Sequence, residues 1–558
     1  MSPIVILLIG MTIVIGGILW LRLHAFVALI VAALLCAYLT PTINVLNNEQ
    51  RTYGIAIATI NDDGTVVVKP TKKQKIIEGR VHLLRSPEEG GFQQVATGSI
   101  AVKGKSDAGT TLAITFADNG IAVAKGDRIM HHTQLSAAKS KSERNFGERA
   151  AIGFGDTCGK IGIVIAMAAI IGICLMESGA AERIVLSIQK LLGEKRTPLA
   201  FAGSGFILGT PVFFDTVFYL MIPLGKAMRA RTGRNYLLYV LTIVCGATMA
   251  HSLVPPTPGP LLVAEMLDVD LGQMIMGGTI VGLFAATAGF LFATWANKRW
   301  EIPLRESAEL SKEDLEAMVN RDESTLPPLT LSLLPILLPV VLIAGGTAAK
   351  MTMDNMGDAV PTWVVRATPF LDVVGNKNIA LSIAAGIALL LLGFRKGMTR
   401  QKLATSVQHA LASGGIIILI TAGGGAFGQI LQQTDIAATI GDMVPATQVG
   451  LLPLAFIICT AIRTAQGSAT VAMITTAPIV LNLVGSEPLS YSPLYLACAI
   501  GCGSKPISWM NDSGFWVISK MSGLTEGEML KTNTIMGLIM GTVGLLITML
   551  GAWLLPLV

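Results

Sequence analysis

Five ionisable side chains lie inside apolar stretches of this chain, and they have the clearest capacity for chemistry. They are Asp215, His251, Arg463, Lys505 and Asp512. A charged side chain at bilayer depth is costly unless it faces a partner or a watery cavity, so such residues mark ion and substrate pathways. Acids in such places suit proton transfer and cations suit the binding of an organic anion. The residue types therefore indicate transport chemistry.

The two carboxylates, Asp215 and Asp512, are the candidate proton-coupling residues. Burial favours the protonated form of a carboxylate, which is what a proton carrier needs. A structural role is the alternative for each of them. Asp215 could cap a hairpin arm or pair with Arg463 or Lys505, and Asp512 could cap a helix that follows a break. Lys505 could attract an anion or neutralise Asp512.

Polar side chains near the same positions are candidate substrate ligands. Arg463 could hold a carboxylate through two parallel hydrogen bonds, snorkel to the interface, or pair with an acid. His251 could donate to a substrate, take part in proton movement, or simply pack as a neutral side chain. Hydroxyl and amide groups would hydrogen-bond a polyhydroxylated substrate, and the candidates of this kind are Thr210, Thr257, Gln466, Ser468, Thr470, Asn511 and Ser513.

The segments that carry these residues are broken by Gly and Pro. The breaks fall at 209–211, 255–260, 464–468 and 511–513. Irregular backbone at membrane depth survives only where protein or a watery cavity receives its polar groups. Paired breaks in two halves of a chain point to a transporter's binding site, and helix N-termini aimed at the midplane would attract an anion.

Matching residues at a nearly constant spacing indicate that the two halves arose by internal duplication. Adding 255 to the residue number takes Pro223 to Pro478 and Gly259 to Gly514. The predicted fold class is therefore an all-α polytopic membrane protein with two repeats, each of five transmembrane helices and one re-entrant hairpin. Because five is odd, the second repeat must be inverted relative to the first.

The composition supports a membrane protein. Hydrophobic residues make up 52% of the chain, charged residues 14%, and the mean hydropathy is +0.63. Lys and Arg cluster in short loops, which fits the positive-inside rule better than nucleic-acid binding. The seven cysteines lie in or beside apolar runs, and catalytic and cofactor motifs are absent, so we expect no enzyme, no metal and no cofactor.

Ten apolar runs are long enough to cross the bilayer. Segments 200–223 and 452–481 are instead predicted to be re-entrant hairpins. The first has basic residues on both flanks and should enter from the cytoplasm, whereas the second lacks them and should enter from outside. The ten runs are 3–20, 25–41, 160–177, 237–256, 274–296, 329–349, 379–394, 412–431, 493–513 and 533–555.

The chain divides into five parts. Alternating apolar runs and Asp-Asn-Gly turn signals predict a β-rich insertion at 46–145, which could gate, oligomerise or recruit a partner. His131 and His132 in it could bind a metal or anion, although solvated polar residues are the favoured interpretation. Both termini and the insertion should lie outside a bacterial inner membrane. The parts are 1–45 with two helices, 46–145, 146–296 completing repeat 1, a cytoplasmic linker at 297–328, and 329–558 as repeat 2.

Several stretches resemble signature regions of the gluconate permease family. They are HSLVPPTPGP, RTAQGSATVAM and WMNDSGFWVISKMSGLTEGEMLKT, and FFDTVFYLMIPL resembles the family's hairpin with its intramembrane acid. The resemblance covers residues 1–41 and 150–558. Thr257 stands where gluconate permeases often have His, and the 46–145 insertion replaces a connection that is usually short.

The resemblance implies proton-coupled uptake of gluconate or a related sugar acid. It places the chain in the ion transporter superfamily, whose members move a transport domain like an elevator against a scaffold. The expected partners are a small organic anion, H⁺, membrane lipid and, by analogy with the superfamily, a second copy in a homodimer. Two alternatives are a sodium-coupled carboxylate or amino-acid carrier, which needs oxygen ligands for a cation, and a nutrient sensor that uses the outer domain.

Overall fold

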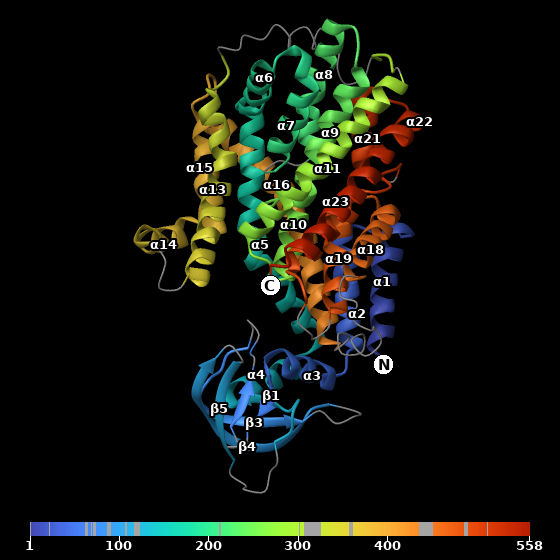
Figure 1. Ribbon diagram of the computed structural model, residues 1–558. Helices are drawn as coiled ribbons and strands as arrows, with labels where there is room; N and C mark the ends of the chain where they lie inside the picture. Colours follow the sequence, from blue (N-terminus) through green and yellow to red (C-terminus); the bar gives the residue numbers. More distant parts are fainter. Residues whose placement is uncertain are drawn as a thin grey trace.

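The computed structural model shows a bundle of α-helices with a small β-barrel at one end (Figure 1). Both chain termini lie toward the barrel end of the bundle. The described residues are 2–557 with the exception of 22, 62–64, 69, 71–73, 86–90, 107–108, 117–122, 211–213, 301, 306–324, 357–360, 435–449, 485–488 and 511.

Six helical segments of the described chain are long and apolar enough to cross a bilayer. Two bent pairs also pass this test when each pair is taken as one span. These are α2 (Ala25–Leu39) with α3 (Thr42–Tyr53), bent by 99°, and α14 (Thr362–Val374) with α15 (Lys377–Gly393), bent by 69°. The six are α5 (Phe146–Glu177), α9 with α10 (Tyr236–Met266), α11 (Leu271–Arg299), α13 (Leu329–Met356), α16 (Arg400–Gln433), and α22 with α23 (Glu526–Leu554).

All ten predicted crossings fall on helices, but two of the helices that belong to neither bent pair are short. Helix α1 (Pro3–Leu19) has 17 residues. Helix α20 (Pro493–Gly503) has 11 and stops at a break before α21 (Ser513–Ser522). Large apolar side chains such as Ile280 and Phe284 are exposed on α11, as expected of a surface that meets lipid. The bundle is that of a multi-pass membrane protein, with fewer full-length helices among the described residues than predicted.

Two pairs of consecutive helices lie in the segments for which hairpins were predicted, and we refer to each pair as a hairpin. The first consists of α7 (Thr197–Gly209) and α8 (Phe214–Thr232), so its second arm runs past the predicted end at 223. The second consists of α18 (Leu451–Gln466) and α19 (Ala469–Leu483). The first hairpin lies near α6 (Ala180–Leu192) at the end away from the barrel, and the second lies toward the barrel end (Figure 1).

Two broken helices pass between the hairpins. Helix α9 ends at Leu253, and α10 begins at Pro258, because the Pro-Pro-Thr-Pro-Gly-Pro run lacks the N–H groups that a continuous helix needs. Helix α9 is almost completely enclosed by protein and packs closely on α7. A Cβ at Gly246 would collide with the carbonyl oxygen of Ala202, so glycine is required for this approach.

The insertion forms a closed six-stranded barrel in the order β1-β2-β5-β4-β3-β6, with every neighbouring pair antiparallel. Alternate residues fill its interior, as the period-2 sequence pattern predicts. Helices α3 and α4 (His132–Ser142) lie between the barrel and the bundle (Figure 1). The strands are β1 (Ile55–Ile60), β2 (Val66–Val68), β3 (Gly79–Arg85), β4 (Gln93–Ser106), β5 (Gly109–Phe116) and β6 (Arg128–His131).

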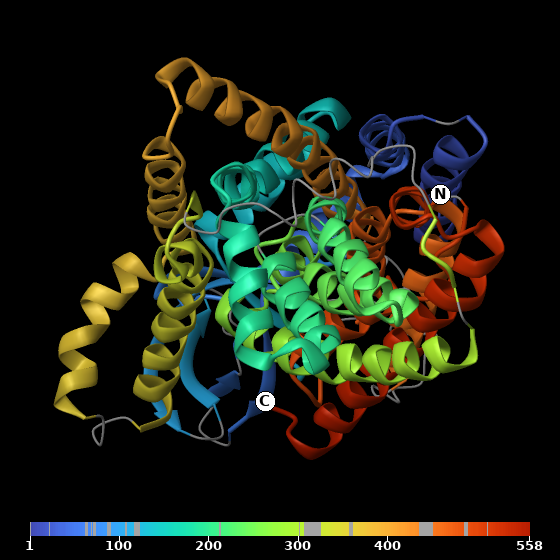
Figure 2. The same ribbon diagram turned by 90° about the horizontal axis from the view of Figure 1, so that it is seen from above.

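Helices α13, α14 and α15 form an arm at one edge of the molecule, with α14 projecting sideways (Figure 2). The arm contacts α5 through α15 and contacts α11 through α13. It is also tied to α10 by an ion pair, in which Lys377 Nζ lies 2.7 Å from Glu265 Oε2. The arm therefore stands apart from the hairpins but touches the broken helix that passes between them.

Candidate functional site

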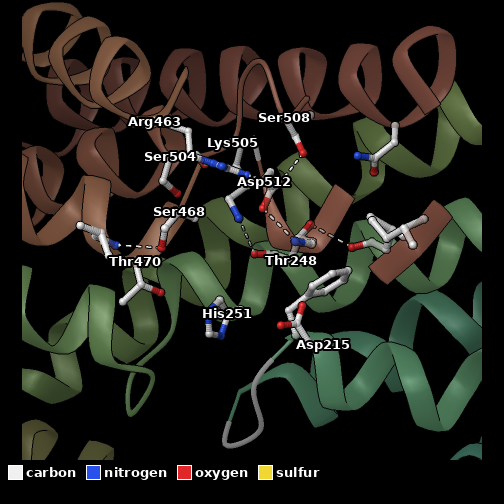
Figure 3. Close-up of a pocket in the computed structure, with 18 of the residues that line it drawn as sticks. Asp215, Thr248, His251, Arg463, Ser468, Thr470, Ser504, Lys505, Ser508 and Asp512 are labelled. Carbon is white, nitrogen blue, oxygen red and sulfur yellow. Dashed lines mark hydrogen bonds and ion pairs between the residues drawn. The ribbon is translucent and has the colours of Figure 1, made fainter. Parts of the chain in front are cut away.

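A cavity of about 420 Å³ lies where the hairpins and the broken helices meet (Figure 3). This volume is in the usual range for small-molecule sites. Its lining combines apolar side chains with polar ones from α8, α9, α16, α18, α19, α23 and the break between α20 and α21. The polar side chains labelled in Figure 3 are Asp215, Thr248, His251, Arg463, Ser468, Thr470, Ser504, Lys505, Ser508 and Asp512.

A buried ion pair joins the second hairpin to the break between α20 and α21. Arg463 Nη2 lies 2.5 Å from Asp512 Oδ2, and Arg463 Nε donates to the carbonyl of Ser504 at 3.1 Å. Asp512 also accepts from the Ser508 hydroxyl at 2.5 Å and, as the N-cap of α21, from the N–H of Gly514 at 2.9 Å. Its carboxylate is thus fully engaged in holding the break.

One guanidinium nitrogen of Arg463 remains available. Arg463 is only 5% exposed, and its Nη1 has no hydrogen-bond partner among the described residues. A buried donor that is left unsatisfied is costly, so such a group in a cavity wall is poised for a ligand. The arrangement suits an acceptor such as a carboxylate oxygen.

Asp215 faces the same cavity from the start of α8. No described residue forms an ion pair or hydrogen bond with its carboxylate, so the alternative in which it pairs with Arg463 or Lys505 is not what the structure shows. The two intramembrane acids therefore differ. Asp512 is held by three donors, whereas Asp215 meets the cavity with no such partner in the described part of the chain.

Lys505 supplies the second cation of the site. It lies at the end of α20, is 8% exposed, and its Nζ donates to the carbonyl of Thr248 at 3.2 Å. His251 stands on α9 one turn after Thr248 and also lines the cavity (Figure 3). Arg463 and Lys505 make this cavity attractive to an anion because both are buried, and charges interact more strongly where water is excluded.

The tip of the second hairpin closes one side of the cavity. Gly467 adopts a left-handed conformation with φ of 87°, which ends α18. Ser468 then caps α19 by accepting from the N–H of Val471 at 3.3 Å. The N-terminus of α19 with Ser468 and Thr470 lines the cavity, and its positive dipole end favours bound negative charge.

The structure brings together six of the predicted site residues and separates two. Thr210 donates to the carbonyl of Phe206 at 3.2 Å, and Thr257 donates to that of Val254 at 2.8 Å. Both hydroxyls donate to carbonyls that lack a backbone partner at a helix end, and neither hydroxyl lines the cavity. Asn511 and the side chains of Gln466 and Ser513 lie outside the described residues. The six in the cavity wall are Asp215, His251, Arg463, Ser468, Thr470 and Asp512.

Sequence reasoning missed several polar residues of the wall. Lys505 was considered as an anion-attracting residue or a counter-ion for Asp512, but it was not placed among the candidate substrate ligands. Ser508 lies two residues after Pro506 and gives no signal of its own, and Asn533 lies in a π-helical turn that the apolar pattern does not reveal. The missed polar wall residues are Thr216, Thr248, Ser413, Ser504, Ser508 and Asn533.

Helical hairpins and broken helices around a polar cavity within an apolar bundle define a membrane transporter. The fold is similar to the crystal structure of the Alcanivorax borkumensis YdaH transporter, with a TM-score of 0.54 over 78% of this chain and 94% of that one, at 15% identity. More particularly, this chain belongs to the GntP family of permeases, whose sequence model matches residues 141–554.

Individual relatives agree with this assignment. The low-affinity gluconate transporter of Escherichia coli K12 is 32% identical over 401 residues, which are 71% of this chain and 86% of that one. The gluconate permease of Pseudomonas aeruginosa is 33% identical over 399 residues, with the same shares. The expected resemblance to gluconate permeases is confirmed, and the chain is a permease and not an enzyme. The matched range begins after β6, so the barrel and residues 1–41 lie outside it.

Proposed function

We propose that this permease is a secondary active transporter that carries gluconate or a related sugar acid into the cell together with protons. The observation that supports this most is the buried, unpartnered Nη1 of Arg463 in the wall of a cavity of about 420 Å³. Two relatives are named as gluconate carriers, and a sugar acid supplies the carboxylate that such a donor requires.

The substrate carboxylate binds between Arg463, Lys505 and the N-terminus of α19. All three are positive and line the same cavity. Ser468 and Thr470 offer hydroxyls to the remaining substrate atoms, and His251 lines the same cavity (Figure 3). Three candidate substrate ligands have side chains that lie outside the described residues, and these candidates stay predictions. They are Gln466, Asn511 and Ser513, which are close in the chain to Ser468 and Asp512.

Asp215 carries the coupled proton, and Asp512 does not. Protonating Asp512 would strip Arg463 of its counter-ion and disturb the hydrogen bonds that hold the break between α20 and α21. Asp215 has no comparable partner among the described residues, so it can gain and lose a proton without breaking an ion pair. Its position on the cavity wall gives the proton and the substrate a shared route.

The movement is an elevator-type alternation between two inverted repeats. The hairpins lie toward opposite ends of the bundle, as inversion requires (Figure 1). The hairpins with α9, α10, α20 and α21 would move against a scaffold that includes α1, α2 and α13 to α15. We place the protein in the bacterial inner membrane with both termini and the barrel outside, and scaffold contacts would join two copies in a homodimer.

Uptake of radiolabelled gluconate into proteoliposomes tests this function. An inward proton gradient should drive accumulation by the wild type. Asp215→Asn should abolish accumulation but retain exchange of labelled for unlabelled gluconate, because binding and movement do not need the gradient. Accumulation that requires sodium and ignores the proton gradient would replace the proposal with the sodium-coupled carrier, and absence of flux would favour the sensor.

A further inference from the structure

A π-helical turn brings a polar residue to the cavity from an unexpected direction. Residues Leu530–Thr534 form this turn between α22 (Glu526–Met529) and α23 (Ile535–Leu554). Single π turns inside α-helices are rare and occur frequently at functional sites. Here the turn lies in a helix that contributes to the cavity wall.

Of the polar side chains on this turn, Asn533 is the one that reaches the cavity. Thr532 turns away and donates to the carbonyl of Glu528 at 2.6 Å, whereas Thr534 donates to the carbonyl of Ser508. Asn533 lines the cavity, is only 5% exposed, and no described residue hydrogen-bonds to its carboxamide. Because buried polar groups are nearly always satisfied, this carboxamide is a site for a ligand group.

The position of Asn533 is fixed by its surroundings. Asn533 on the π turn and Gly537 and Met540 on α23 recur at helical spacing and form one face that borders the cavity. Gly537 lets this face approach closely, since a Cβ there would lie 2.8 Å from the carbonyl oxygen of Lys505. The bond from Thr534 to the backbone of Ser508 ties the turn to the segment that also holds Asp512.

We propose that Asn533 determines specificity by hydrogen-bonding one hydroxyl of the bound sugar acid, an inference that rests on the proposed function. A carboxamide both donates and accepts, and so does a hydroxyl, so the two groups match. Arg463 and Lys505 recognise charge and would accept any small carboxylate. Asn533 instead distinguishes hydroxylated acids from those that lack the hydroxyl at one position, because the unmatched carboxamide would then stay buried without a partner.

Competition binding to the purified full-length protein tests this assignment. Labelled gluconate is displaced by unlabelled gluconate and by each monodeoxy analogue, with the wild type, Asn533→Ala and the control Thr532→Val. The control changes a neighbour on the same turn whose hydroxyl faces Glu528 and not the cavity. The wild type and the control should bind one analogue about 10- to 100-fold more weakly than gluconate, which is the effect expected of one buried hydrogen-bonding group left without a partner. Asn533→Ala should bind that analogue and gluconate equally and keep the wild-type ratios for the others.

The outcomes separate this proposal from the function on which it rests. If the wild type binds no sugar acid, both are wrong. If the wild type binds gluconate but Asn533→Ala weakens all analogues by the same factor, or changes none, the assignment of Asn533 alone is overturned. Should Asn533→Ala fail to fold, Asn533→Ser keeps a smaller hydrogen-bonding group. Asn533→Ser should then reduce the affinity ratio between gluconate and that one monodeoxy analogue, and leave the ratios for the other analogues unchanged. An unchanged ratio for that analogue would also overturn the assignment.

Discussion

Replacing Asp512 with asparagine should destabilise the protein more than any change at an exposed ion pair. The substitution keeps the shape of the side chain but removes the counter-ion of Arg463, whose side chain and that of Asp512 are 6% and 11% exposed. The amide that replaces the carboxylate would also turn N–H groups of its own toward the donors of Arg463 or Ser508. A buried charge is thus left without compensation.

The size of the effect follows from these contacts. Removing one partner of a buried ion pair costs about 3–5 kcal/mol of unfolding free energy. An exposed pair is worth about 0–1 kcal/mol. Lys350 and Asp372 form such a pair at 3.3 Å with side chains 62% and 46% exposed, so Asp372→Asn is the matched control. The double variant Arg463→Met with Asp512→Asn should recover part of the loss, because it no longer buries a lone charge.

Unfolding in mixed detergent micelles, followed by tryptophan fluorescence, measures these differences. Trp509 donates to the carbonyl of Thr464 and Trp516 donates to that of Met510, so both indoles report on this region. The order of stability should be wild type, then Asp372→Asn, then the double variant, then Asp512→Asn. The reasoning is refuted if Asp512→Asn unfolds like the control, or if removing both charges is as harmful as removing the carboxylate alone.

Three further predictions concern other parts of the molecule. Gly246→Val should prevent α7 from packing on α9 and lower the yield of folded protein on size-exclusion chromatography, and a normal monodisperse yield would contradict this. Glu265→Gln breaks the ion pairs with Lys377 and Lys160 and should cost about 1 kcal/mol at low salt, and less at high salt, in the same unfolding assay. A salt-independent loss would point to packing instead. Burial, then the charge of a neighbouring histidine, lowers the pKa of His82 in the barrel below its ordinary 6.5. The unfolded chain therefore binds more protons there, and barrel stability should fall as the pH drops below 6.5. His82→Gln should flatten this profile in hydrogen exchange, and an unchanged profile would exclude His82 as its cause.

Local sequence patterns predicted the elements well. The barrel follows from alternating residues between turn signals, and the breaks follow from prolines and glycines that no helix accommodates easily. Proline does not end every helix, however. Helix α8 continues through Pro223 to Thr232, and α13, α14 and α19 also contain internal prolines. A membrane helix tolerates proline where neighbouring groups hydrogen-bond to the carbonyl that the missing N–H leaves free. The sequence does not show which groups lie near that carbonyl.

The pairing of side chains across the site could not be predicted from local pattern. Arg463 and Asp512 are 49 residues apart, and either acid could have been the partner of Arg463 until the fold placed them. Thr210 and Thr257 have the right chemistry for a substrate, but each hydroxyl bonds to its own helix end. Local hydrogen bonding of this kind competes with ligand binding. The sequence does not show whether a hydroxyl bonds to the backbone or faces the cavity, whereas the three-dimensional structure does.

The charges around the cavity give the proposed coupling a physical basis. Arg463 and Asp512 cancel each other as an ion pair, which leaves Lys505 and Asp215 as the groups that set the net charge of the wall. With Asp215 ionised the wall is neutral and holds an anion weakly, whereas a proton on Asp215 leaves one positive charge that an organic anion balances. The carrier loaded with one anion and one proton is then neutral at its centre, and this lowers the electrostatic cost of moving the site through the bilayer. Binding the substrate without the proton would bury an uncompensated charge, so we expect the two to bind together.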